Sequence, residues 1–246
     1  MHRTRVKICG ITRVEDALLA CGLGADAIGM VMTPSSPRCM SIERARAIRE
    51  ALPAFVDAVM LTHDLPASRV REIIDAVRPD LVQFHGSEDA AFCESFGVRY
   101  LKAIGMDGAA DVRTFVDAHP RAIGFVLDGH AAGAQGGQGR VFDWTRVPRD
   151  LDRPVILAGG LNADNVANAI RTVRPWAVDV ASGVESAPGV KDHHKLRAFF
   201  AAINAFESLS HSERGTDEGS ETSSVPVIPN PRPAFGRPLP KGEGKR

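Results

Sequence analysis

The sequence lacks an excess of charge of either sign. Its 246 residues include 30 Lys and Arg against 30 Asp and Glu, so the formal net charge is zero. Proteins that bind nucleic acids usually carry a basic patch or a high positive charge, because the phosphate backbone dominates that binding. The charge balance therefore argues against a nucleic acid partner.

Long apolar runs are also lacking. A membrane-spanning helix needs about 20 consecutive apolar residues, and no run in this chain approaches that length. The first ten residues, MHRTRVKICG, lack the apolar stretch and the small-residue cleavage site of a secretory signal. We expect a soluble, cytoplasmic protein with no membrane contact.

Cysteine is scarce and scattered. The four thiols form no CxxC pair and no Cys/His cluster, which argues against a zinc site and against a disulfide framework. The phosphate-loop pattern GxxxxGK[ST] and a GxGxxG after the first strand are absent as well. The sequence therefore predicts reduced thiols and neither a metal nor a nucleotide cofactor.

The last 40 residues have little that could form a core. Residues 207–246 contain six Pro, five Gly and six Ser with only scattered apolar side chains. Such a segment cannot bury enough apolar surface to offset the entropy lost on ordering. We therefore predict one folded domain over residues 1–206 and a disordered tail over residues 207–246.

Residues 1–206 contain a repeat of a short apolar strand, a break and an amphipathic helical stretch. The strands start about 24 residues apart on average, which is the size of one βα unit. Eight such units favour the α/β class and a closed (β/α)₈ barrel, a TIM barrel, over the alternative of an open doubly wound sheet. The predicted strands are 6–9, 26–32, 56–61, 81–84, 100–103, 122–127, 155–158 and 177–181, and the last helix is 196–206.

Two loops at the expected catalytic end of the barrel have the composition of a phosphate site. The segment LAGGLNADN places Gly159 and Gly160 before a helix with Asn162 as its expected N-cap, and VASGVESAPG offers Ser182 and Gly183. Glycines let backbone amides approach an anion, and a helix N-terminus favours negative charge. Each loop alone could be a tight turn, but two adjacent loops of one design favour phosphate.

Cys9 ends the first strand, and Lys7 lies two residues earlier on the same face. A nearby ammonium favours the thiolate, the form that accepts a proton. Because strands 8 and 1 are neighbours in a closed barrel, Asp179 is expected to pair with Lys7 beneath Cys9. The alternatives are a buried apolar cysteine and a purely structural ion pair.

Asp128 closes the apolar run IGFVLD and precedes a glycine-rich loop at 131–140. It could be a turn aspartate bonded to the backbone. It could also be a carboxyl group at the rim of strand 6, with a loop that covers the ligand. A cysteine base and an aspartic acid on opposite sides of one pocket suit an isomerisation by proton transfer.

Three further polar residues lie in the same set of loops. Arg38 follows the second strand and could bind a carboxylate, although the residues alone favour a solvated surface charge. Gln83 and His85 share a face at the end of strand 4. His85 could contact a ligand or could be satisfied by neighbouring backbone.

Seven motifs span nearly all of residues 5–206. They are KICGITRVEDA, SPR, VQFHG, LDG, GGQGRVFDW, PVILAGGLNADNV and VDVASGVESAPGVKD. Together, and in this order, they resemble the phosphoribosylanthranilate isomerase family. The chain departs from the family pattern in MVMTPSSPRCM after strand 2 and in DAVMLTHD at strand 3.

The resemblance implies a (β/α)₈ barrel that catalyses the Amadori rearrangement of a phosphosugar, N-(5-phosphoribosyl)anthranilate, without metal or organic cofactor. It implies Cys9 as general base, Asp128 as general acid and Arg38 as the group that holds the anthranilate carboxylate. We expect a monomer, with a dimer as the alternative. The rival functions are another cofactor-free phosphosugar isomerase or epimerase, and a barrel that binds phosphosugars or a protein partner without catalysis.

Overall fold

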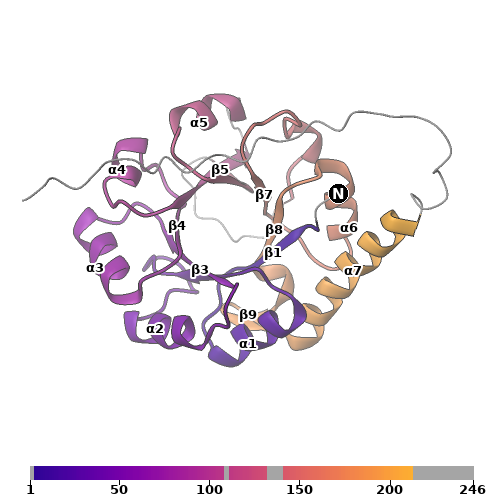
Figure 1. Cartoon of the computed structure of the whole chain (residues 1–246), viewed down its shortest axis with the longest axis horizontal. Helices are drawn as coiled ribbons and strands as arrows, with labels where there is room; N and C mark the ends of the chain where they lie inside the picture. The colour runs from indigo at the N-terminus through magenta and orange to yellow at the C-terminus, as the bar shows by residue number, and fades with distance from the viewer. Residues whose placement is uncertain (1–2, 108–110, 132–140, 213–246) are drawn as a thin grey trace, which may run out of the picture.

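The computed structural model describes residues 3–107, 111–131 and 141–212. Eight parallel strands form a closed barrel in the order of the sequence, and β8 pairs with β1 to close it (Figure 1). This confirms the predicted (β/α)₈ barrel. The strands are β1 (Arg5–Ile8), β2 (Ala27–Val31), β3 (Asp57–Thr62), β4 (Leu81–Phe84), β5 (Tyr100–Asp107), β6 (Gly124–Ala131), β7 (Val155–Leu157) and β8 (Ala177–Val180).

The helices form a ring outside the strands (Figure 1). They are α1 (Val14–Leu23), α2 (Ile42–Ala51), α3 (Ala67–Val77), α4 (Ala90–Glu94), α5 (Val112–Ala118), α6 (Val166–Val173) and α7 (His193–Ser212). Two short 3₁₀ helices, η1 (Trp144–Arg146) and η2 (Ser182–Val184), and a hairpin of β9 (Glu185–Ala187) and β10 (Val190–Lys191) complete the structure. None of the helices in the described parts of the chain is long and apolar enough to cross a membrane.

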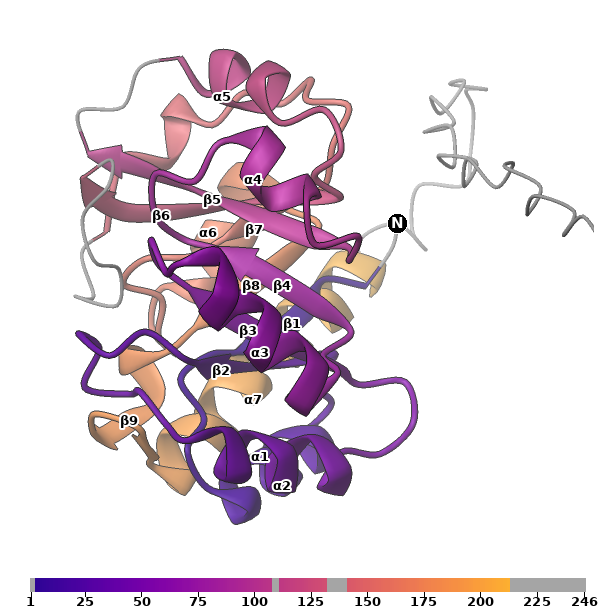
Figure 2. The same cartoon turned by 90° about the vertical axis from the view of Figure 1, so that its left-hand side faces the viewer.

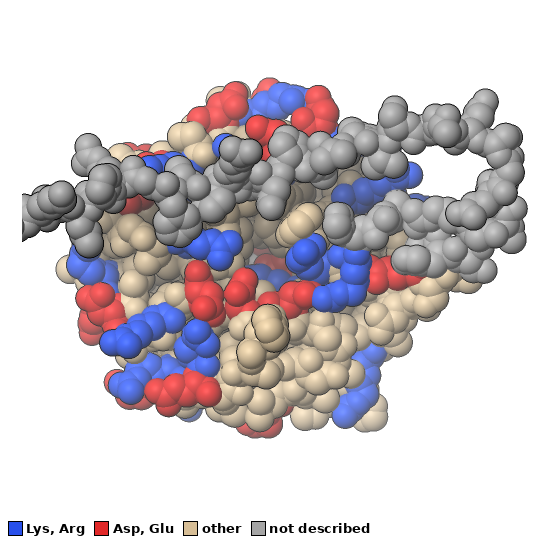
Figure 3. Space-filling view, viewed as in Figure 1, with Lys and Arg blue, Asp and Glu red and all other residues tan. Residues whose placement is uncertain are grey.

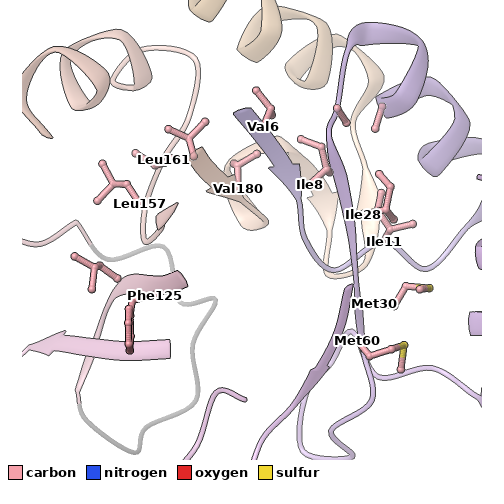
Figure 4. Close-up of a cluster of buried hydrophobic side chains, with 14 of the residues drawn as sticks. Val6, Ile8, Ile11, Ile28, Met30, Met60, Phe125, Leu157, Leu161 and Val180 are labelled. Carbon is pink, nitrogen blue, oxygen red and sulfur yellow. The ribbon is translucent and has the colours of Figure 1, made fainter. Parts of the chain in front are cut away.

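The barrel has two apolar layers, because side chains alternate between the faces of each strand. One layer packs the strands against the helices and includes Ile8, Met30 and Phe125 (Figure 4). The other layer fills the barrel interior and includes Val59 and Ile156. Near the C-terminal end of each strand, the residues whose side chains point to the barrel interior therefore face into its mouth.

All eight strands run in the same direction, so their C-terminal ends meet on one side of the molecule. In Figure 2 the arrowheads of β5 and β6 lie on the left, away from the N-terminus. Figure 3 shows the face at the opposite end, where acidic and basic side chains are interspersed. One half-buried pair at this end joins Arg49 to Asp80 at 3.0 Å, just before β4. The mixture of signs agrees with the neutral composition.

Two predicted helices differ from the structure. The described residues between β6 and β7 contain only η1, because Asp143 caps it through the Thr145 N–H at 3.0 Å and Pro148 follows directly. The last helix is longer at both ends than predicted. It begins at His193 behind the side chain of Asp192, which accepts two backbone N–H groups.

The predicted boundary of the tail is also wrong by six residues. Helix α7 continues to Ser212, and the Glu207 carboxylate accepts the backbone N–H of Thr4 at 2.6 Å, which anchors the helix to the start of β1. The composition of residues 207–246 placed Glu207 in the tail, because a contact with a residue as distant in sequence as Thr4 leaves no signal in the residues around Glu207. Residues 213–246, and residues 132–140 of the covering loop predicted at 131–140, lie outside the described residues.

Candidate active site

A pocket of about 720 Å³, partly open to solvent, lies at the C-terminal ends of the strands. Every predicted site residue lines it except Lys7, which contacts the lining residue Asp179. The predicted residues in the lining are Cys9, Arg38, Gln83, His85, Asp128, Gly159, Gly160, Asp179, Ser182 and Gly183. The structure therefore brings the predicted set together in one place.

The predicted ion pair beneath Cys9 is present. Lys7 lies opposite Asp179 in the register of β1 and β8, and the Lys7 Nζ is 2.8 Å from Asp179 Oδ2. Both side chains are buried, with 4% and 7% of their surface exposed. Cys9 continues the ladder, since its N–H donates to the Val180 carbonyl at 2.9 Å. The closure of the barrel thus fixes all three groups.

Gly29 on β2 makes room for the side chains of Cys9 and Lys7. A Cβ atom on this residue would lie 2.9 Å from the Cys9 Sγ and 3.1 Å from the Lys7 Nζ. Both atoms therefore face the same small space, and any larger residue would displace them. This confirms that Lys7 and Cys9 share the interior face.

Burial and Lys7 have opposite effects on the pKa of Cys9. Burial raises the pKa of the Cys9 thiol above its ordinary value, and the opposing effect of the Lys7 ammonium is smaller. Burial alone would lower the pKa of Lys7, but Asp179 and Cys9 together raise it. The surroundings therefore favour the charged form of Lys7 and, taken together, oppose ionisation of Cys9.

Asp128 and His85 face each other across the mouth. The His85 Nε2 lies 3.7 Å from Asp128 Oδ2, and the Gln83 Nε2 is 3.0 Å from His85 Nδ1. With the amide donating to Nδ1, a neutral imidazole carries its proton on Nε2, toward Asp128. This confirms that Gln83 and His85 share a face. His85 contacts the side chain of Gln83 and also lines the pocket.

The two glycine loops pack directly on each other. A Cβ on Gly183 would lie 1.9 Å from the carbonyl oxygen of Leu161, so only glycine fits there. The prediction that Asn162 caps the following helix is wrong, because α6 begins at Val166. The Asn162 Oδ1 instead accepts the N–H groups of Asp164 and Asn165 at 2.9 and 3.2 Å, within the preceding turn.

Arg38 is not a surface charge. Its Nε donates to Glu185 Oε1 at 2.8 Å and its Nη2 to Oε2 at 2.6 Å, a bidentate pair that is almost completely buried. The sequence favoured a solvated Arg38 because its partner, Glu185, lies 147 residues away and on a short hairpin. Arg38 nevertheless lines the pocket.

The family model described as N-(5'-phosphoribosyl)anthranilate (PRA) isomerase matches residues 6–202. The chain belongs to the phosphoribosylanthranilate isomerase family. The N-(5'-phosphoribosyl)anthranilate isomerase of Xanthomonas euvesicatoria pv. vesicatoria is 50% identical over 209 residues, which cover 82% of this chain and 94% of that protein.

Solved phosphoribosylanthranilate isomerases have the same fold. The crystal structure of the Thermus thermophilus protein is 40% identical, with a TM-score of 0.75, over 82% of this chain and 99% of that one. Another isomerase of the family was solved in complex with reduced 1-(o-carboxyphenylamino)-1-deoxyribulose 5-phosphate. It is 36% identical, with a TM-score of 0.68, over 82% of this chain and 99% of that one.

Two charged residues of this phosphoribosylanthranilate isomerase site were missed by the sequence reasoning. Glu185 and Lys191 belong to the β9–β10 hairpin and contact each other at 2.9 Å. The signal that could have indicated them was their place in the motif VDVASGVESAPGVKD, directly after the strand that carries Asp179. In the described parts of the chain, no group of three or more His, Cys, Asp or Glu side chains could hold a metal ion.

Proposed function

We propose that the protein converts N-(5-phosphoribosyl)anthranilate to 1-(2-carboxyphenylamino)-1-deoxyribulose 5-phosphate in tryptophan biosynthesis, by proton transfer without a cofactor. The observation that carries the proposal is one pocket that combines Cys9, Asp128, two packed glycine loops and Arg38. In that substrate, Cys9 serves the reacting carbon and Asp128 the ring oxygen. The glycine loops serve the phosphate and Arg38 the carboxylate.

The substrate is held at two charged ends in this proposal. Backbone N–H groups of the loops after β7 and β8, at Gly160 and Gly183, bind the phosphate, as the glycine composition allows. Arg38 binds the anthranilate carboxylate with the N–H groups that Glu185 does not use. His85 contacts the sugar beside Asp128. Two fixed ends place the ribose between the catalytic groups.

The first proton transfer opens the ribose ring. Asp128 acts as a general acid and donates its proton to the ring oxygen, while the bond from that oxygen to C1 breaks. The lone pair of the anthranilate nitrogen then forms a double bond to C1, which gives a protonated Schiff base. This step requires Asp128 to enter the reaction protonated, beside the His85 imidazole.

The second transfer removes the proton from C2. Cys9 acts as the base, and the C–H electron pair forms a C1–C2 double bond that neutralises the Schiff base. The resulting enolamine tautomerises to the ketone when C1 is protonated. The ammonium of Lys7 favours the thiolate through its positive charge beside Sγ, and Asp179 holds that ammonium in place.

The choice of substrate tests this proposal against its nearest rival. Purified protein is expected to remove the fluorescence of phosphoribosylanthranilate and to leave ribose 5-phosphate and other phosphosugars without an anthranilate ring unchanged. Turnover of a ring-free phosphosugar with no turnover of phosphoribosylanthranilate would favour a different isomerase or epimerase. Binding of both without turnover would favour a non-catalytic barrel.

The variant Arg38→Ala is expected to raise KM for phosphoribosylanthranilate by at least about tenfold, because a charge-assisted hydrogen bond to the carboxylate contributes about 1.5 to 3 kcal/mol. The effect on kcat should be smaller, since Arg38 moves no proton. Steady-state kinetics of the variant give both constants. An unchanged KM would show that Arg38 does not hold the substrate.

The variant Lys7→Met is expected to move the pH profile of kcat/KM to higher pH. The base must be a thiolate, so the rate rises with pH through the pKa of Cys9, and Lys7 is the charge that opposes the increase caused by burial. Losing that charge raises the pKa further, so activity falls at neutral pH and returns at alkaline pH.

A matched control for Lys7→Met is Lys102→Met. This change also removes a buried lysine that pairs with a carboxylate, Glu88 at 3.4 Å, but its ammonium does not face Cys9. Either loss costs about 3 to 5 kcal/mol of unfolding free energy, so both variants are compared below their melting temperatures. A midpoint that shifts equally in both variants would contradict a specific effect of Lys7.

A further inference from the structure

Glu185 is the buried anion on which the orientation of Arg38 depends. It lies on β9, in the hairpin that follows β8, and 7% of its surface is exposed. Both of its carboxylate oxygens accept hydrogen bonds from Arg38, from Nε at 2.8 Å and from Nη2 at 2.6 Å. Two contacts in one plane fix the rotation of a planar guanidinium as well as its position.

This contact leaves part of Arg38 available to a ligand. A guanidinium has five N–H groups, and Glu185 takes two of them along one edge. The three other N–H groups belong to Nη1 and Nη2, on the edges that Glu185 does not occupy. Because Arg38 lines the pocket, a carboxylate bound there meets a fork whose direction has already been set.

Lys191 fixes Glu185 in turn. The Lys191 Nζ donates to the carbonyl oxygens of Cys9 at 2.6 Å and Ala181 at 3.1 Å, and to Glu185 Oε1 at 2.9 Å. Three acceptors match the three N–H groups of an ammonium. Burial lowers the pKa of Lys191 below its ordinary value, although Glu185 favours the charged form. The same side chain therefore ties the hairpin to the backbone of the residue that carries the base.

The charges of these groups also favour an anion. Arg38 and Lys191 are cations and Glu185 is an anion, so the three buried side chains carry one net positive charge. Burial alone would raise the pKa of Glu185, but Arg38 and Lys191 hold it below its ordinary value, which keeps the carboxylate ionised. One carboxylate on the ligand balances the remaining charge.

We infer that Glu185 is a positioning residue for substrate binding, which acts through Arg38 to aim its guanidinium at the anthranilate carboxylate. The inference rests on the proposed function, because it takes Arg38 as the group that binds this carboxylate. Glu185 itself moves no proton. Its loss should therefore weaken binding of carboxylate-bearing ligands and leave the chemical step largely intact.

The test is Glu185→Gln in the full chain, which keeps the size of the side chain and removes the anionic acceptor. KM for phosphoribosylanthranilate and the inhibition constant of the reduced product analogue should each rise at least about tenfold, with kcat changed less than about threefold. Constants within twofold of the original in a folded variant would overturn the inference.

Inorganic phosphate separates positioning from general disturbance. It competes for the loops after β7 and β8, and Ser182 and Gly183 lie directly before β9. Its inhibition constant should stay within about twofold in Glu185→Gln, because the phosphate does not reach Arg38 in the proposed binding mode. A parallel loss of phosphate affinity would indicate that Glu185 only holds the segment together, which contradicts the inference.

A double-mutant cycle identifies the route of the effect. In an Arg38→Ala background, Glu185→Gln should change KM by less than about twofold, since the group it orients is gone. A full and independent increase would contradict action through Arg38. If Arg38→Ala itself leaves KM unchanged, the proposed carboxylate site fails. If Arg38→Ala raises KM and Glu185→Gln does not, only this inference fails.

Two further variants keep the test decisive. Asp80→Asn also removes an acid that pairs with an arginine, Arg49, but at the opposite end of the barrel, so KM should not change. If Glu185→Gln does not fold, Glu185→Asp replaces it, because this change keeps the charge and withdraws it by one methylene. The analogue should then bind more weakly while phosphate does not, and unchanged binding of both would overturn the inference.

Discussion

Replacing Cys9 with alanine is expected to lower kcat by at least about a hundredfold, since general base catalysis typically contributes about 10² to 10⁴ in rate. The thiol lies directly after β1 and lines the pocket, and Lys7 supports its ionised form. No other change in the pocket accompanies the loss of a single sulfur atom, so binding of the reduced product analogue should stay within about threefold.

Two more variants separate loss of the Cys9 base from a general effect of removing a thiol. Cys9→Ser should be as inactive as Cys9→Ala, because an alcohol does not ionise in the range where a thiol does. Cys21→Ala removes a half-buried thiol from α1, outside the pocket, and should keep the original kcat. Turnover in Cys9→Ala at more than about a tenth of the original rate would show that another group removes the C2 proton.

Replacing Asp128 with asparagine is expected to lower kcat by a similar factor, again at least about a hundredfold. The amide keeps the shape of the side chain on β6 but cannot give up a proton to the ring oxygen. His85 lies 3.7 Å from Asp128 and remains in place, so the variant also tests whether the imidazole can act alone. The analogue, which needs no ring opening, should still bind.

A suitable control for Asp128→Asn is Asp75→Asn, the same chemical change at an exposed position of α3. Its kcat should match that of the original protein. Near-normal turnover in Asp128→Asn would assign the acid to a different group, and His85→Asn would then be the variant to measure. A large loss in the control as well would point to a defect in the preparation.

The barrel and its main ion pair could be predicted because their signals are local and repeated. Eight apolar strands at regular spacing imply a closed parallel barrel, and closure makes β1 and β8 neighbours. The alternation of side chains then places Lys7 opposite Asp179 without any knowledge of packing. The place of the two glycine loops could also be predicted, since loops that follow the C-terminal ends of the strands form the mouth of the barrel.

The features that could not be predicted depend on contacts between distant segments. The pair of Arg38 and Glu185 joins the loop after β2 to a hairpin after β8, and neither residue shows from its neighbours that it is buried. The raised pKa of Cys9 has the same origin, because desolvation depends on what surrounds the thiol in space. The extension of α7 required the contact between Glu207 and Thr4.

The central claim is that this barrel isomerises phosphoribosylanthranilate with its own side chains alone. The most direct test is the loss of substrate fluorescence with purified full-length protein in the presence of excess EDTA. We predict enzymatic turnover at the same rate with and without the chelator, and a fall of at least about a hundredfold in Cys9→Ala. No turnover above the uncatalysed background, or activity that EDTA abolishes, would contradict the account.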